Sequence, residues 1–213
     1  MPDSMSAERR ALMRAFGAEL VLSDGTLGMR GAIEEAERLA REIPNAFVPG
    51  QFENPANAAA HLKTTGPEIF EDTDGEVDIF VAGVGTGGTV TGVGRYLKSV
   101  KPTAEIVGVE PASSPFLTEG RGGAHKIQGI GAGFAPKVLD RTVLDRIIPV
   151  SDEDAIATAR DFGKKEGILI GISSGAAVYA AVEEAKKPEN AGKSIVVLLP
   201  DSGDRYISSG LYD

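Results

Sequence analysis

A glycine-rich stretch, residues 83–89 with the sequence GVGTGGT, is the segment best suited by residue type and spacing to hold a ligand. It follows the apolar run 77–82 and opens a helix-like segment that reaches about Lys101. A strand that leads through a glycine turn into a helix presents free backbone N–H groups and the positive end of the helix dipole to an anion. The pattern therefore predicts an anion site, most often one for a phosphate.

The residues of this turn alone leave three interpretations open. Gly83, Gly85 and Gly88 satisfy G-x-G-x-x-G, and Glu110 ends a second apolar run 22 residues after Gly88, as in dinucleotide-binding folds. The turn equally suits a different phosphate ligand. It also suits close packing of a strand on a helix with no ligand at all.

Two further turns place serine and glycine directly after apolar runs: residues 173–175 (SSG) and 202–203 (SG). In parallel sheets, ligands bind beyond the carboxyl ends of the strands. The three turns can therefore line one pocket, with phosphate at the first and a neutral hydroxyl at the second. The alternative for the serines is simple capping of the following helices.

Composition excludes several other classes of function. The formal net charge of −9 and the lack of a basic run argue against nucleic acid or an anionic membrane surface as the main partner. No cysteine is present, which excludes thiolate catalysis and zinc–thiolate sites, and neither His61 nor His125 has a metal-ligand spacing. Residues 167–182 are too short and too interrupted to span a bilayer, and the first residues lack a signal-peptide pattern, so we expect a cytoplasmic protein without a metal site.

Apolar runs and helical periods alternate along the chain. Several of the expected strands are apolar throughout, which favours an α/β fold with a parallel sheet covered on both faces. The long irregular stretch 111–133 is of a kind that is often functional. Strands are expected at 18–22, 77–82, 105–109, 147–150, 168–172 and 194–199, and helices at 6–16, 29–43, 54–62, 68–71, 88–101, 151–166 and 176–185.

Seven segments, in the same order and spread over the whole chain, resemble the cysteine synthases (O-acetylserine sulfhydrylases). The resemblance implies the three-layer, parallel-sheet architecture of fold type II pyridoxal-phosphate enzymes, and it displaces the dinucleotide interpretation. The segments are 5–10 (MSAERR), 51–57 (QFENPAN), 64–69 (TTGPEI), 82–89 (AGVGTGGT), 125–133 (HKIQGIGAG), 171–177 (GISSGAA) and 203–206 (GDRY).

The resemblance also implies roles for individual residues. Ser173 matches the hydroxyl that hydrogen-bonds the pyridine nitrogen of pyridoxal 5'-phosphate, and Gln51 matches a residue on the substrate side, near the substrate carboxylate. The implied reaction replaces the acetate of O-acetyl-L-serine by sulfide and gives L-cysteine. The residues matching the phosphate loop are Gly85, Thr86, Gly87, Gly88 and Thr89, and those matching a substrate-side loop over the cofactor are Gly129, Ile130 and Gly131.

One part of the family pattern has no counterpart here. The lysine that attaches the cofactor lies in the family before the point that matches Met1, and none of the ten lysines has a matching context. The resemblance therefore predicts the C-terminal portion of such an enzyme, with an incomplete smaller domain at 1–50 and the cofactor-binding domain at 51–213. We expect no catalytic residue in this chain and no cysteine synthesis by it alone.

Partners follow from the same resemblance. The family is usually dimeric, so self-association is expected, favoured by sheet edges and apolar helix faces left uncovered. A second hypothesis is a non-catalytic module that keeps the phosphate pocket and binds the C-terminal peptide of serine acetyltransferase, which the family receives at its active-site mouth. A nicotinamide dehydrogenase remains a third.

Overall fold

Four parallel strands form the centre of the structure, a computed structural model that describes residues 1–213. The strand order is β3-β2-β1-β4, so the two inner strands are β2 and β1. Val81 of β1 pairs with Val107 of β2 on one side and with Val197 of β4 on the other. The strands are β1 (Ile79–Gly83), β2 (Glu105–Pro111), β3 (Arg146–Val150) and β4 (Ile195–Val197).

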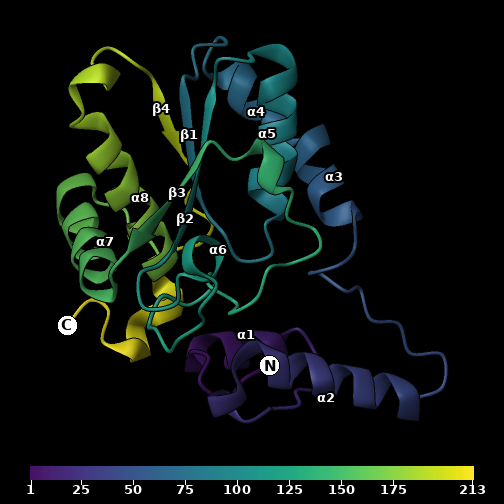
Figure 1. The fold of residues 1–213 in the computed structure, drawn as a ribbon. Coiled ribbons are helices and arrows are strands. Elements are labelled where there is room, and N and C mark those ends of the chain that lie inside the picture. The colour runs from purple at the N-terminus through teal and green to yellow at the C-terminus, as the bar shows by residue number, and fades with distance from the viewer.

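Helices cover both faces of this sheet (Figure 1), as the apolar strands require. Val81 and Val107 belong to a core cluster with α7 (Asp152–Glu166) and α8 (Ile172–Ala185). Phe80 and Ile106 point to the other face and pack with α5 (Gly88–Val100). Two further helices, α3 (Ala56–Lys63) and α4 (Thr65–Asp72), pack on α5. The predicted α/β fold with a covered parallel sheet is confirmed.

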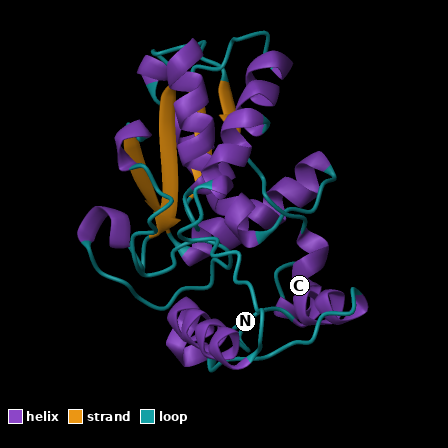
Figure 2. Cartoon of the chain, turned by 90° about the vertical axis from the view of Figure 1, so that its right-hand side faces the viewer, coloured by secondary structure: helices purple, strands orange, loops and turns teal.

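The first 50 residues lie apart from these layers, as two helices, α1 (Ala7–Ala15) and α2 (Gly28–Glu42). In Figure 2 the strand arrowheads point toward the end of the molecule where these helices lie. The division into domains at residue 50 stays a prediction. Short helices complete the chain: η1 (Gly25–Leu27), α6 (Phe116–Glu119), η2 (Arg141–Val143), η3 (Pro188–Asn190) and η4 (Gly203–Ser209). None of the helices combines the length and apolar character that crossing a membrane requires.

Two predicted strands are wrong. Residues 18–22 form no ladder, and the only bridge nearby joins Ser23 to Pro2. Residues 168–172 make a single bridge between Ile170 and Ser202, and α8 already begins at Ile172. The run is only partly buried, since Ile168 is 59% exposed whereas Ile170 is 2% exposed. Its backbone instead holds the C-terminal segment, because Leu169 accepts a hydrogen bond from the Gly203 N–H at 3.0 Å.

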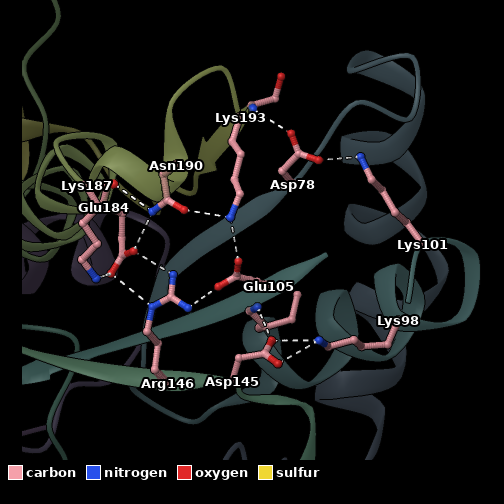
Figure 3. A network of polar contacts seen from close by, with 12 residues as sticks. Asp78, Lys98, Lys101, Glu105, Asp145, Arg146, Glu184, Lys187, Asn190 and Lys193 are labelled. Carbon is pink, nitrogen blue, oxygen red and sulfur yellow. Dashed lines mark hydrogen bonds and ion pairs between the residues drawn. The ribbon is translucent and has the colours of Figure 1, made fainter. Parts of the chain in front are cut away.

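A polar network ties together the amino-terminal ends of the strands (Figure 3). Arg146 at the start of β3 binds both Glu105 at the start of β2 and the fully buried Glu184 of α8. Burial alone would raise the pKa of Glu184, but the hydrogen bonds from Arg146 and Lys187 outweigh it and hold the pKa below its usual value. A ligand is expected beyond the carboxyl ends of the strands. This network lies at the opposite end of the sheet.

Candidate site for a phosphorylated cofactor

The glycine-rich turn joins the end of β1 at Gly83 to the start of α5 at Gly88. Gly87 has φ +80° and ψ 0°, a left-handed conformation that glycine adopts without strain. The backbone N–H groups of Gly85, Thr86 and Gly87 donate no hydrogen bond within the chain. Together with the amino end of α5, these free donors form a cradle that fits a phosphate group.

Glycine is required at two positions of this cradle by close approach. A Cβ atom on Gly85 would overlap the carbonyl oxygen of Gly129, and one on Gly88 would overlap the side-chain oxygen of Asn57. The turn is therefore packed against two other segments, and neither glycine can be replaced without moving them. Small residues and free N–H donors are the chemistry that the phosphate group of pyridoxal 5'-phosphate, the cofactor implied by the resemblance, requires.

Two side chains of α3 brace the turn. Asn57 donates from Nδ2 to the Thr86 hydroxyl at 2.9 Å and to the backbone carbonyl of Gln51 at 2.8 Å. His61 lies 3.3 Å through Nε2 from the Thr89 hydroxyl and 2.9 Å through Nδ1 from that of Thr65. Burial lowers the pKa of His61, which keeps the imidazole neutral at pH 7. The exposed Gln51 is thus joined to the phosphate turn through Asn57.

The loop at residues 129–131 lies directly on the glycine-rich turn. Gly131 donates its N–H to the Val84 carbonyl at 3.1 Å, and the Ile130 side chain packs against Gly83. Gly129, at φ +99°, is close enough to Ser173 that a Cβ on it would lie 3.6 Å from the serine hydroxyl. The structure therefore brings Gly85, Gly129 and Ser173 together at one end of the sheet, although 88 residues separate the first from the last.

Ser173 lies in the first turn of α8 and is 4% exposed. It does not cap the helix, because the N-cap is Gly171 and no side chain makes a capping bond there. Its hydroxyl has no hydrogen-bond partner within the chain, which leaves it free for a ligand. The adjacent Ser174 donates its hydroxyl to the Asp201 carbonyl at 3.3 Å, so the third predicted turn also reaches this end of the sheet.

Glu110 is not available to a dinucleotide. It is 1% exposed and caps α6, accepting hydrogen bonds from the Leu117 N–H at 2.8 Å and the Thr118 hydroxyl at 2.5 Å. A small pocket beside it shares Gly85 and Gly131 with the site. An acidic residue engaged in this way cannot bind the ribose that the dinucleotide interpretation assigns to it.

The fold and this pair of turns define a class: an α/β protein with free N–H groups at a helix amino-terminus close to a buried, unpaired serine hydroxyl, an arrangement suited to a phosphorylated ligand. The sequence profile of the pyridoxal-phosphate dependent enzymes matches residues 1–201. The chain belongs to this family.

Relatives of known structure and function support the assignment. The chain is 52% identical to cysteine synthase A of Escherichia coli (strain K12), over the whole chain and 68% of that protein. The crystal structure of cysteine synthase from Entamoeba histolytica superposes with a TM-score of 0.93 at 52% identity and covers the whole chain. A hydrogen sulfide-producing enzyme of Fusobacterium nucleatum superposes with a TM-score of 0.94 at 46% identity, over 97% of this chain and 70% of that one. The chain spans 63% of the Entamoeba protein.

His61, Asn57 and Asp201 have no assigned role among the predictions made from the sequence. Asn57 and His61 share one face of α3 at a spacing of four residues, and such spacing could have identified them as a pair. Apart from Tyr206, five residues further on, the side-chain partners of Asp201 lie 27 and 192 positions away, which no local spacing indicates.

Proposed function

We propose that this chain forms the cofactor-holding part of a cysteine synthase, which replaces the acetate of O-acetyl-L-serine by sulfide and gives L-cysteine. The identity of 52% with cysteine synthase A supports the reaction. The observation that carries the proposal is the placement of the free Ser173 hydroxyl next to the loop that lies on the phosphate turn.

Each part of the site has a separate task in this proposal. Pyridoxal phosphate supplies an electron sink for bond cleavage at the amino-acid substrate when it is bound. The N–H groups of the turn from Gly85 to Thr89 would hold its phosphate, and the Ser173 hydroxyl would hydrogen-bond its ring nitrogen. Because a neutral hydroxyl does not favour a protonated ring as a carboxylate would, Ser173 favours β-elimination over reactions that need a long-lived carbanion.

The substrate side is formed by Gln51 and the loop from Gly129 to Gly131. Seven of the ten lysines are paired with carboxylates, and no lysine lines the cavity beside Gly85. A lysine is the group that attaches this cofactor covalently and moves the substrate proton. We therefore propose that the chain alone binds the cofactor without a covalent bond and makes no cysteine.

The finer assignments rest on the family resemblance. We propose a cytoplasmic protein that self-associates and binds the C-terminal peptide of serine acetyltransferase. Self-association is supported by exposed apolar side chains in the first 50 residues, where Phe16 and Phe47 are 81% and 80% exposed. Sedimentation velocity tests the self-association, and titration with the peptide tests the peptide binding.

The main experiment titrates the chain with pyridoxine 5'-phosphate, which carries the phosphate and the ring but no aldehyde, followed by ³¹P NMR. We expect saturable binding that Gly88→Ala abolishes, because the new methyl group displaces Asn57. Gly163→Ala is the matched control. Its Cβ would lie 3.0 Å from the end of the flexible Leu169 side chain and at least 3.6 Å from every other atom beyond its own helix.

Pyridoxal phosphate with a borohydride trap and intact mass then tests for covalent attachment. Absence of any stoichiometric lysine adduct agrees with the proposal. A single adduct on one lysine, with a spectral change on adding O-acetylserine, would show that the chain carries its own nucleophile and would contradict it.

A further inference from the structure

Three side chains from distant segments meet beside the start of α8. Arg9 of α1 donates from Nη2 to the Asp201 carboxylate at 2.5 Å and to the Tyr206 hydroxyl at 2.7 Å. Tyr206 in turn donates its hydroxyl to the same carboxylate oxygen at 2.7 Å. We call Arg9, Asp201 and Tyr206 the Asp201 triad.

Asp201 contacts residues on both sides of Ser173, the backbone of Gly171 and the side chain of Ser174. Its carbonyl accepts the N–H of Gly171 at 3.1 Å and the hydroxyl of Ser174 at 3.3 Å. Its carboxylate packs on Gly171 so closely that a Cβ there would overlap it. The position of Asp201 therefore sets the position of the Ser173 hydroxyl.

Arg9 and Tyr206 fix Asp201 because its carboxylate has few alternatives. The Asp201 side chain is 9% exposed, Tyr206 is fully buried, and one carboxylate oxygen of Asp201 has no partner at all. Burial and the Asp201 charge raise the pKa of Tyr206 to about 12, so the phenol keeps the proton that it donates. Removal of Arg9 would leave a buried carboxylate without its cation, which is strongly unfavourable.

The helix that supplies Arg9 is attached to the sheet layers by polar contacts. No residue of α1 is buried. Besides Arg9, Glu8 accepts hydrogen bonds from the N–H and hydroxyl of Ser208 in η4, at 2.6 and 2.7 Å. Arg9 thus contributes both to the docking of α1 on η4 and to the position of Asp201.

We propose that Arg9 and Tyr206 are positioning residues for the ring end of the cofactor site, acting through Asp201 on Ser173. The inference rests on the proposed function, since it assigns the ring nitrogen to Ser173. Because coupling between two sites is reciprocal, a bound pyridine ring also stabilises the docking of α1.

The test compares two ligands, inorganic phosphate and pyridoxine 5'-phosphate, by ³¹P NMR titration of the whole chain. We expect Arg9→Gln and Tyr206→Phe to weaken the affinity for pyridoxine 5'-phosphate by roughly tenfold, as the loss of a charge-assisted hydrogen bond would. Affinity for inorganic phosphate stays unchanged, because the glycine turn does not contact the triad. Arg9→Lys restores part of the affinity. Arg14→Gln, on the exposed face of the same helix and outside any ion pair, behaves like the wild type.

Hydrogen exchange provides the reciprocal measurement. Pyridoxine 5'-phosphate should slow exchange in residues 7–15 of the wild type and not in Arg9→Gln. Equal affinity of wild type and Arg9→Gln for pyridoxine 5'-phosphate, or an equal loss for both ligands, would overturn the inference. If Arg9→Gln does not fold, Arg9→Lys and Tyr206→Phe decide. If the wild type binds inorganic phosphate but not pyridoxine 5'-phosphate, the proposed function itself is contradicted, and not only the role of the triad.

Discussion

At the scale of single residues, His61 shows how a side chain outside the glycine turn supports it. Its lowered pKa means that the folded protein binds a proton less readily than the unfolded chain, in which histidine titrates at about pH 6.5. Between the two pKa values the unfolded state holds more protons. The contribution of neutral His61 to stability is therefore complete above about pH 6.5 and is lost as the pH falls through the folded pKa.

We predict that His61→Gln makes the stability of the folded protein less dependent on pH between the folded and unfolded pKa values of His61. Thermal unfolding of the wild type and the variant, measured in steps from about pH 7.5 to 5.5, shows how steeply the stability of each protein changes with pH. The wild type should lose stability faster on acidification, since only it must keep an imidazole neutral. Parallel curves would show that His61 is not responsible.

At the scale of elements, helix caps are local and could be predicted. The sequence predicts a helix at 151–166, and in the structure Ser151 is the N-cap of α7: its Oγ accepts the Asp154 N–H at 3.0 Å and donates to the Asp154 carboxylate at 2.7 Å. We predict that Ser151→Ala lowers the free energy of unfolding by about 1 kcal/mol.

Urea unfolding measures this change, with Ser99→Ala as the matched control. Ser99 donates to the Tyr96 carbonyl inside its own helix and caps nothing. Its replacement should alter stability by only a few tenths of a kcal/mol. Equal effects of the two substitutions would contradict a specific role for the cap.

The same distinction explains which features the sequence could not predict. The glycine turn and α3 follow from neighbouring residues, and both are found where expected. The runs 18–22 and 168–172 look like strands because they are short and apolar, but nothing local tells whether a sheet edge lies beside them. The meeting of Gly129 with Ser173, and of Arg9 with Asp201, depends on the whole fold and has no spacing signal.

At the scale of the whole molecule, the two ends of the sheet differ in whether their polar groups are free or paired. The carboxyl end holds free N–H groups and an unpaired hydroxyl, whereas the amino end is closed by the network around Arg146 in Figure 3. We predict that Arg146→Met destabilises the protein by about 3 kcal/mol, because the buried charge of Glu184 loses its main partner.

Urea unfolding again provides the measurement, and the affinity for pyridoxine 5'-phosphate should stay unchanged in the folded variant. Arg121→Met is the control, since its ion pair with Glu119 is more than half exposed and is worth at most about 1 kcal/mol. A variant of Arg146 as stable as the control, or one with weaker ligand binding, would contradict this separation of the two ends.

The strand order has a consequence for how the chain reaches this structure. Ile79 of β1 pairs with Ile195 of β4, a partner 116 residues further along the chain, although β4 contributes only three residues to the sheet. Such a contact forms late, because a long loop must close first. Until then the open side of β1 exposes unpaired backbone groups to other molecules. A chain in which β4 has not yet docked therefore carries an additional risk of aggregation through the uncovered edge of β1.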